Sequence, residues 1–302
     1  MEFLTKYDFA NYEGREVLED VTSSFSLSFK LLKRDERNAI NTIYAFFSYI
    51  DDIVDEQCST EEENKQKMIR LEFWKDTIEK LYSAEPAITE LLPFHKLIMR
   101  YNIPKQYFIA LIDGCRRDLV QNRYETFDDF KEYCYGVASI VGLIVIELLG
   151  YKYEETKNYA VNLGYALQLT NILRDVKVDK DRNYIYLPLE DLAKFNYSEA
   201  DLLAEKYNDN FIELMQFQAA RAREYYHKAR KSLRPDERIT LFVAEIMDGI
   251  YYRLLEKIEL NEFRIFKKRI RVSTPHKLYI TFKHWISAIL LVDRLKRGKG
   301  KH

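Results

Sequence analysis

Hydrophobic residues recur at helical intervals along most of the chain. Between residues 37 and 56, four of them are spaced at i, i+4, i+7 and i+11: Ile43, Phe47, Ile50 and Val54. This spacing places them on one face of an α-helix. Similar patterns predict further helices over residues 65–83, 87–101, 104–118, 127–149, 154–179, 208–231, 238–260 and 279–295. Because only 9 Gly and 6 Pro provide turn signals, the pattern predicts an all-α fold.

Two glycines, Gly136 and Gly142, lie inside the helix expected over residues 127–149. Glycine lowers helix stability by roughly 0.5–1 kcal/mol relative to alanine. We therefore expect something to approach the backbone closely at these positions, either a neighbouring helix or a ligand.

A stripe of polar side chains lies along one face of the helix expected over residues 154–179. Asn171, Asp175 and Asp179 recur every fourth residue, and Gln168 precedes them by three. Side chains at this spacing lie on one helix face, while the residues between them are mostly apolar. Buried carboxylates are costly unless they are protonated, paired or bound to a metal, and oxygen donors suit Mg²⁺. A solvated acidic edge, helped by Arg174 and Lys177, is the simpler alternative.

A second acidic stripe ends the helix expected over residues 37–56. Asp51 and Asp55 lie four residues apart, Asp52 and Glu56 form a neighbouring pair, and the preceding residues are almost all aromatic or aliphatic. If both stripes face one cavity, their carboxylates repel one another by several kcal/mol unless cations neutralise them. Two or three Mg²⁺ ions would do so and would leave positions open for a diphosphate.

The high aromatic content of the chain adds a possible carbocation-stabilising cavity to this interpretation. The chain contains 23 Tyr and 18 Phe, which would suit a cavity lined by π faces, although an aromatic-rich core would account for them too. Loss of diphosphate from an allylic carbon gives a carbocation that such a cavity can stabilise and shield from water. Carboxylate-bridged iron is a rival, but it needs Glu-x-x-His pairs. The five His residues do not provide that spacing.

Bulk charge and cysteine usage exclude several other classes. The net charge of −1 gives no electrostatic case for nucleic acid,. Cys58, Cys115 and Cys134 show neither a zinc spacing nor a disulfide framework,. The charged N-terminus does not resemble a signal peptide, and no apolar run reaches the roughly 18 residues of a spanning helix. We expect a cytoplasmic protein.

The domain organisation follows from the absence of repeats and linkers in the sequence. We predict an N-terminal arm over residues 1–20 and one helical domain over residues 21–302. The C-terminal segment 279–295 combines apolar residues such as Trp285 and Ile289 with Lys283 and Arg294. Such a stripe usually packs on its own domain. Peripheral contact with a membrane surface is the alternative.

The residues between Val21 and Lys277 resemble the squalene/phytoene synthase family, which includes dehydrosqualene synthases. The resemblance is carried by four motifs: Asp51-Asp52-Ile53-Val54-Asp55; Gln168 to Asp175 with Asp179; Ile185-Tyr186-Leu187-Pro188; and Tyr133 to Ala138 with Val141-Gly142. It implies an isoprenoid-synthase helical bundle with a central cavity. It also implies head-to-head (1′–1) condensation of two prenyl diphosphates, farnesyl or geranylgeranyl, through a cyclopropyl diphosphate to a C30 or C40 hydrocarbon.

The resemblance also assigns roles to residues. The Mg²⁺ ligands would be Asp51, Asp55, Asn171, Asp175 and Asp179, with Tyr133 near the reacting carbons. The diphosphate contacts would be Arg174, Tyr186, Tyr251 and Arg269. The prenyl tunnel would be lined by Phe25, Val137, Ala138, Val141, Gly142 and Gln168. NADPH is not indicated, since no Gly-rich dinucleotide motif is present, although relatives that use it do not need one.

Three basic residues that this family usually carries are absent from their expected positions. Ser48 stands where an Arg precedes the first aspartate motif, Ser23 replaces a Lys, and Tyr184 replaces the basic residue before Ile185. Ser48 is thus the residue expected at that substrate-binding position. The candidates to replace the missing charges are Lys30, Lys33, Arg34 and Arg182. This difference leaves two alternatives open. The protein could be an enzyme that acts on one prenyl diphosphate, or it could be a non-catalytic family member.

Overall fold

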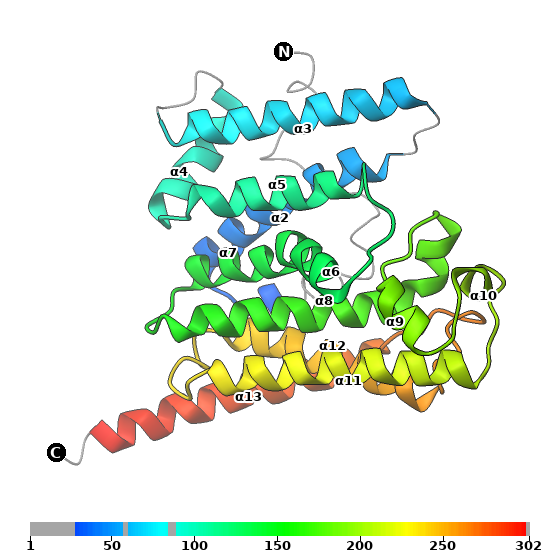
Figure 1. Ribbon diagram of the computed structural model, residues 1–302. Coiled ribbons are helices and arrows are strands. Elements are labelled where there is room, and N and C mark those ends of the chain that lie inside the picture. The colour runs from blue at the N-terminus through cyan, green and yellow to red at the C-terminus, as the bar shows by residue number, and fades with distance from the viewer. Residues whose placement is uncertain (1–27, 57–59, 84–88, 300–302) are drawn as a thin grey trace.

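A computed structural model shows the chain as a helical bundle (Figure 1). It describes residues 28–56, 60–83 and 89–299, and side chains as far as residue 290. Within these ranges there is no β-strand, and the one β-bridge joins Arg123 to Ile185. The all-α prediction is therefore confirmed. Phe25, Ser23 and the predicted arm over residues 1–20 lie outside the described residues, so the arm stays a prediction.

The helices follow one another with short connections. They are α2 (Arg34–Asp55), α3 (Glu61–Leu81), α4 (Leu92–Arg100), α5 (Lys105–Arg117), α6 (Phe127–Cys134), α7 (Ile140–Leu149), α8 (Glu155–Asp181), α9 (Leu189–Lys194), α10 (Glu199–Leu203), α11 (Asp209–Ser232), α12 (Phe242–Leu260) and α13 (Thr274–Lys299). A 3₁₀ turn, Thr89–Leu91, precedes α4, and a π-helical segment, η2 (Tyr135–Ser139), joins α6 to α7.

Helix α12 begins at Phe242 rather than at the predicted residue 238. Glu237 is buried and its carboxylate accepts hydrogen bonds from the Lys152 backbone N–H at 2.7 Å and from the Thr156 hydroxyl at 2.5 Å. These bonds fix the chain before α12 in turns. Helical periodicity in the sequence does not reveal such a tertiary anchor.

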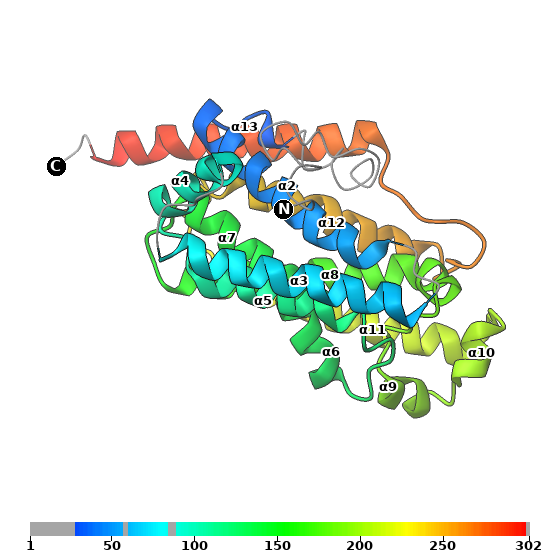
Figure 2. The same cartoon turned by 90° about the horizontal axis from the view of Figure 1, so that it is seen from above.

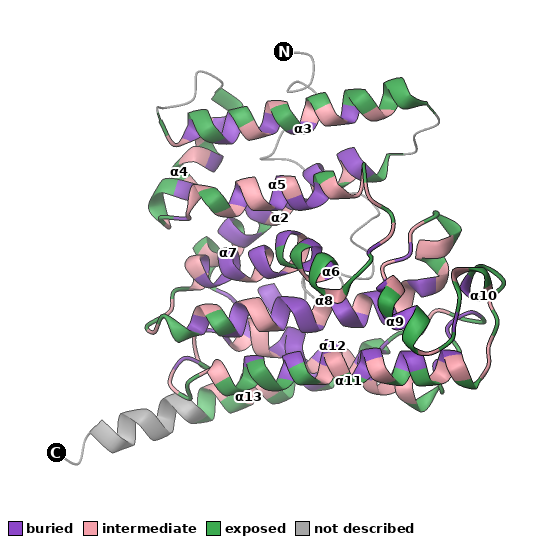
Figure 3. Cartoon of the chain, viewed as in Figure 1, coloured by how far each residue is buried: buried purple, intermediate pink, exposed green. Residues whose placement is uncertain are grey.

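Helix α8 is the centre of the bundle. It packs against α7 and η2 on one side and against α11 and α12 on the other (Figures 1 and 2). Buried residues run along it, including Leu163, Leu169 and Val176 (Figure 3). Burial on several sides explains why its sequence is apolar around most of the helix. The helix runs to Asp181, so Asp175 and Asp179 share it with Asn171, as predicted.

The two helical glycines are close-packing sites, and the approaching groups are helices. A Cβ atom at Gly136 would lie 2.8 Å from the Cα of Gly114 in α5. A Cβ atom at Gly142 would lie 2.9 Å from the Ala160 carbonyl oxygen in α8. The expected close approach is thus confirmed.

Gly164, in the middle of α8, has the tightest contact of this kind, since an added Cβ would lie 2.5 Å from the Cα of Ser139. Overpacking typically costs about 1–3 kcal/mol. We expect Gly164→Ala to lower the free energy of unfolding by that amount in urea denaturation. Helix propensity alone would raise it by up to about 1 kcal/mol, so an unchanged or higher value would contradict the observed packing.

One helix-length segment, residues 127–149, is long and apolar enough to cross a membrane by composition, with a mean hydropathy of 1.7. This corrects the expectation that no such segment exists. More than half of the apolar window, 56%, is buried against the rest of the protein. Its apolar character is explained by packing between α5 and α8.

The acidic end of α2 is fixed by a buried lysine from α3. Lys67 donates to the backbone carbonyls of Val54, at 2.8 Å, and of Glu56. Arg70 pairs with the Glu56 carboxylate at 2.6 Å. Carbonyls at a helix end have no partner within the helix. The lysine supplies one and holds the turn that carries Asp51 and Asp55.

Candidate active site

A cavity of about 330 Å³ opens between α2, α5, η2 and α8, with Tyr251 of α12 on its wall. Most predicted site residues line it: Ser48, Asp51, Tyr133, Val137, Ala138, Val141, Gln168, Asn171 and Tyr251. The π-helical segment carries Val137 and Ala138 to this wall. The structure brings these residues to one cavity. Its lining does not include Asp55, Asp175, Asp179, Gly142, Arg174, Tyr186 or Arg269, so their roles stay predictions.

A second, apolar chamber of about 70 Å³ continues the first one inward. Tyr44, Ala138, Val141, Gly164 and Leu167 line both spaces. Gly142, the remaining predicted tunnel residue of α7, lines only the inner chamber. The two spaces are adjacent because they share these walls. We call them together the tunnel, and its mouth is the end at which Asp51 and Asn171 line the outer space.

The carboxylates at the mouth repel one another. Asp51 is exposed at the edge of the cavity, and partial desolvation, followed by the charges of Asp55 and Asp118, raises its pKa to about 7. Burial and the charge of Asp175 likewise raise the pKa of Asp179 to about 8. Each shift arises first from desolvation and then from neighbouring negative charge, both of which disfavour the ionised carboxylate.

Asp51 of the first stripe and Asn171 of the second line the same cavity, and two further groups act on carboxylates of both stripes. Asp118 raises the pKa of Asp51 in α2 and of Asp179 in α8, whereas Arg182 lowers both. The Arg182 guanidinium lies 3.5 Å from the Asp55 carboxylate. The alternative of a separate solvated acidic edge on α8 does not agree with this arrangement.

Asp175 differs from the other acids because two arginines neutralise it. Arg174 donates to it from Nε at 2.9 Å, and Arg269, from the segment between α12 and α13, donates at 2.8 and 3.1 Å. Burial acts to raise the pKa of Asp175, but these two partners outweigh it and lower the pKa. Two of the expected diphosphate-binding residues therefore lie beside an expected metal ligand.

Asp118, at the C-terminal end of α5, is a site residue that the sequence prediction missed. Its carboxylate accepts hydrogen bonds from the hydroxyls of Tyr133 at 2.9 Å and Tyr186 at 3.1 Å. Burial raises its pKa to about 7, with Asp55 adding to the shift. A carboxylate at a helix C-terminus is unfavourable for the helix dipole. That local conflict is the signal that could have identified it.

Three tyrosines stack beside Asp118. The Tyr133 and Tyr186 rings lie 5.2 Å apart and nearly parallel, and the Tyr184 ring stacks on Tyr186 at 5.7 Å. The Tyr184 hydroxyl donates to the Asp118 backbone carbonyl at 2.8 Å. Tyr184 thus supports the loop instead of supplying a charge.

The donor set at the mouth fits a hard cation such as Mg²⁺. The Oδ1 atom of Asn171 is buried without a hydrogen-bond partner, which is costly unless a ligand engages it. In the described part of the chain, no three acidic, histidine or cysteine side chains converge closely enough to hold a metal by themselves. Ions here would therefore need further oxygens, such as those of a diphosphate or of water.

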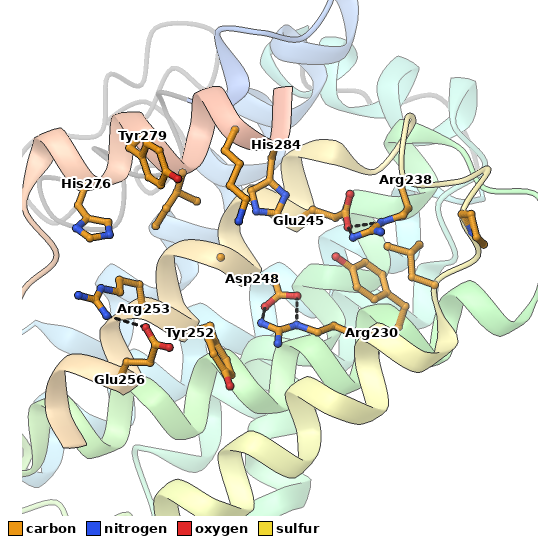
Figure 4. Close-up of a pocket in the computed structure, with 16 residues that line it drawn as sticks. Arg230, Arg238, Glu245, Asp248, Tyr252, Arg253, Glu256, His276, Tyr279 and His284 are labelled. Carbon is orange, nitrogen blue, oxygen red and sulfur yellow. Dashed lines mark hydrogen bonds and ion pairs between the residues drawn. The ribbon is translucent and has the colours of Figure 1, made fainter. Parts of the chain in front are cut away.

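A larger hollow, about 600 Å³, lies elsewhere, between α11, α12 and α13 (Figure 4). It contains none of the predicted site residues. Ion pairs line it, among them Arg230 with Asp248 and Arg238 with Glu245.

Comparison with known proteins agrees with this geometry. Residues 18–276 match the squalene/phytoene synthase family. The chain is 35% identical over 280 residues to a phytoene synthase of Arthrospira platensis, covering 87% of this chain and 88% of the relative. It is 36% identical over 281 residues to a 15-cis-phytoene synthase of Synechococcus elongatus, covering 88% and 89%.

Solved structures show the same fold. A dehydrosqualene synthase in complex with a ligand superposes with a TM-score of 0.73 at 25% identity, covering 96% of this chain and 97% of the other. A squalene synthase of Alicyclobacillus acidocaldarius gives a TM-score of 0.72 at 23% identity, covering 87% and 94%.

The fold and site define an isoprenoid-synthase helical bundle. The chain belongs to the squalene/phytoene synthase family, and it is a prenyltransferase. Membership of this family supports head-to-head condensation of prenyl diphosphates.

Proposed function

We propose that the protein catalyses the Mg²⁺-dependent head-to-head (1′–1) condensation of two farnesyl or geranylgeranyl diphosphates. The reaction would pass through a cyclopropyl diphosphate to a C30 or C40 isoprenoid. The observation that carries the proposal is that Asp51 of one acidic stripe and Asn171 of the other line the same cavity, which an apolar chamber adjoins. The similarity to phytoene synthases supports it.

The acidic mouth would hold two or three Mg²⁺ ions through Asp51, Asp55, Asn171, Asp175 and Asp179. Bound Mg²⁺ would stabilise the diphosphate as a leaving group. Arg174 and Arg269 donate to Asp175, and the guanidinium group is suited to phosphate oxygens. Tyr251, whose pKa burial raises and Arg174 lowers, would contact the diphosphate from α12.

The tunnel walls would orient the prenyl chains and exclude water. Val137, Ala138, Val141 and Gln168 line the cavity next to the mouth. Tyr133 lies where the mouth meets these residues, held by Asp118 and stacked on Tyr186. Its aromatic face could stabilise a positive charge that develops on the substrate carbon.

Arg182 is the candidate to replace the basic residue absent at Ser48. Ser48 lines the cavity one helical turn from Asp51, but its hydroxyl carries no charge. Arg182 lies beside Asp55, at 3.5 Å, and its charge acts on Asp51 and Asp179. It is therefore placed to donate to a diphosphate at the mouth.

The raised carboxylate pKa values predict that Mg²⁺ stabilises the protein more at pH 8 than at pH 6. The folded-state pKa values of Asp51 and Asp118 are about 7, and that of Asp179 is about 8. Their favourable contribution to folding is complete below the unfolded pKa of 3.8. It is lost as the pH rises to 8, because the folded form then has to ionise these groups. At pH 6, Mg²⁺ must displace protons to bind.

Thermal denaturation with and without Mg²⁺ measures this effect. We expect the Mg²⁺-induced rise in Tm to be several degrees larger at pH 8 than at pH 6. An equal rise at both pH values would argue against metal binding by these carboxylates.

Turnover of labelled substrates tests the proposed function. With Mg²⁺ and farnesyl or geranylgeranyl diphosphate, we expect release of diphosphate and a C30 or C40 product. Release with a shorter hydrocarbon or an alcohol would support an enzyme that acts on one prenyl diphosphate. No release from either substrate would support a non-catalytic family member and would overturn the proposal.

Helix α13 carries the features expected for peripheral contact with an anionic membrane. Leu278, Phe282, Trp285 and Ile289 are exposed and lie at i, i+4, i+7 and i+11, so they form one apolar stripe. Exposed Lys283 lies on the same helix, and Lys267 and Lys268 precede it. Apolar and basic groups together favour an interfacial helix. Ile280 and Thr281 on the same helix are buried, so one side of α13 packs on the domain, and we propose that the exposed stripe contacts the membrane.

Co-sedimentation with phosphatidylserine vesicles tests this contact. We expect Phe282→Glu to reduce the bound fraction several-fold, because a charge would have to enter the apolar interface. Ile69→Glu is the matched control, since Ile69 is an exposed apolar residue on α3. Equal binding of the two variants would exclude α13 as the contact surface.

A further inference from the structure

Tyr159, near the beginning of α8, lies between two cavities. It lines the inner apolar chamber of the tunnel together with Val243 and Met247 of α12. It also lines the outer hollow that contains the Arg230–Asp248 and Arg238–Glu245 ion pairs (Figure 4). Only 1% of its surface is exposed.

The two ends of the Tyr159 side chain have different surroundings. Burial raises the pKa of its hydroxyl, and the charges that act on that hydroxyl all belong to the outer hollow: Asp248, Glu245, Arg238 and Arg230. The hydroxyl is buried without a hydrogen-bond partner. Because the inner chamber is lined almost entirely by apolar residues, it is the ring that closes the chamber and the hydroxyl that faces the charges.

The position of Tyr159 along α8 corresponds to the length of a prenyl chain. Asn171 marks the mouth and lies 171 − 159 = 12 residues away on the same helix. At a rise of 1.5 Å per residue, the separation along the axis is about 18 Å. An extended isoprene unit spans four C–C bonds, or about 5 Å. The distance corresponds to about 3.6 units, between C15 and C20, whereas the five units of a C25 chain, about 25 Å long, exceed it by more than one unit.

We propose that Tyr159 ends the prenyl tunnel and sets the longest chain that the enzyme accepts. This inference rests on the proposed function, since it assumes that a diphosphate is held at the acidic mouth. Removing the ring would join the chamber to the outer hollow of about 600 Å³. A C25 chain would then have space for its terminal unit.

The test compares C15, C20 and C25 prenyl diphosphates and their thiodiphosphate analogues, with Mg²⁺ present. For Tyr159→Ala, we expect kcat/KM for the C25 substrate relative to C20 to rise at least 10-fold. The C25 analogue should bind correspondingly more tightly in calorimetry. Tyr159→Phe is the matched control, because it keeps the ring, and it should leave both ratios within twofold of the native values. Unchanged ratios in folded Tyr159→Ala would overturn the inference.

A second variant approaches the same chamber from α12. Ala244 lines the inner chamber but not the outer hollow. We expect Ala244→Phe to shorten the tunnel and to reduce the C20-to-C15 ratio of kcat/KM at least 10-fold. No change in that ratio would likewise contradict the inference. If no analogue binds the native protein, the proposed function itself fails. Binding without dependence on chain length rejects only the role of Tyr159.

Discussion

Replacing Asp179 by asparagine is expected to reduce turnover at least about 100-fold while raising the Tm of the protein. Loss of a group that holds charge at the reacting centre commonly costs this much in rate. The stability gain has a separate cause. Burial and the charge of Asp175 raise the pKa of Asp179 to about 8, so the ionised form is unfavourable in the folded protein.

The sign of the stability effect depends on pH. A group with a raised pKa contributes its full stability below its unfolded pKa and loses it as the pH rises through the folded value. Asparagine carries no charge at any pH. The Tm of the variant should therefore match the native Tm near pH 4 and exceed it at pH 8. At pH 8 we expect a gain of at least about 1 kcal/mol in the free energy of unfolding, or about 2–4 °C in Tm.

Two further variants isolate the role of Asp179. Asp181→Asn, two residues later on the same helix, removes an exposed carboxylate that pairs with Lys180 and should leave turnover nearly native. Asp175→Asn should lose turnover as Asp179→Asn does, but its Tm should fall, because Asp175 is already paired with Arg174 and Arg269. A lower Tm for Asp179→Asn at pH 8, or retained turnover, would contradict the assigned role.

Asp118→Asn is expected to reduce kcat at least about 10-fold with little effect on folding. The Asp118 carboxylate accepts hydrogen bonds from Tyr133 and Tyr186, and hydrogen bonds to a charged group are worth about 1.5–3 kcal/mol. An amide can accept from one hydroxyl through its oxygen, but its NH₂ group would face the other. Tyr133 would then lose its fixed position at the tunnel mouth.

The control for Asp118 is Asp113→Asn, on the same helix. Asp113 pairs with Lys75 at 3.0 Å away from the tunnel, so this variant should keep near-native kcat. Because burial raises the pKa of Asp118 to about 7, the native pH–rate profile should contain an ionisation near that value that Asp118→Asn lacks. Identical kcat and pH profiles for native protein and Asp118→Asn would show that this carboxylate has no part in the reaction.

Much of the fold and of the site could be predicted from local sequence patterns. The apolar spacing of α2 and the four-residue spacing of Asn171, Asp175 and Asp179 depend only on helix geometry, and both agree with the structure. The internal glycines correctly indicated close backbone packing, because few other requirements favour glycine inside a helix.

Features that arise from tertiary contacts were not predictable in this way. Asp118 joins the site because the end of α5 meets Tyr133 and Tyr186, which lie 15 and 68 residues further along the chain. The pairing of Asp175 with Arg269 spans 94 positions, and no local spacing reveals it. The proposed role of Tyr159 could not be predicted from local patterns either, because it depends on a hollow formed by α11, α12 and α13.

The most direct measurement is a crystal structure with Mg²⁺ and a prenyl thiodiphosphate analogue. We expect the ions and the diphosphate between Asp51 and Asp55 on one side and Asn171, Asp175 and Asp179 on the other, with the prenyl chain running toward Tyr159. A diphosphate bound elsewhere, or bound without metal contact to both acidic stripes, would contradict the account.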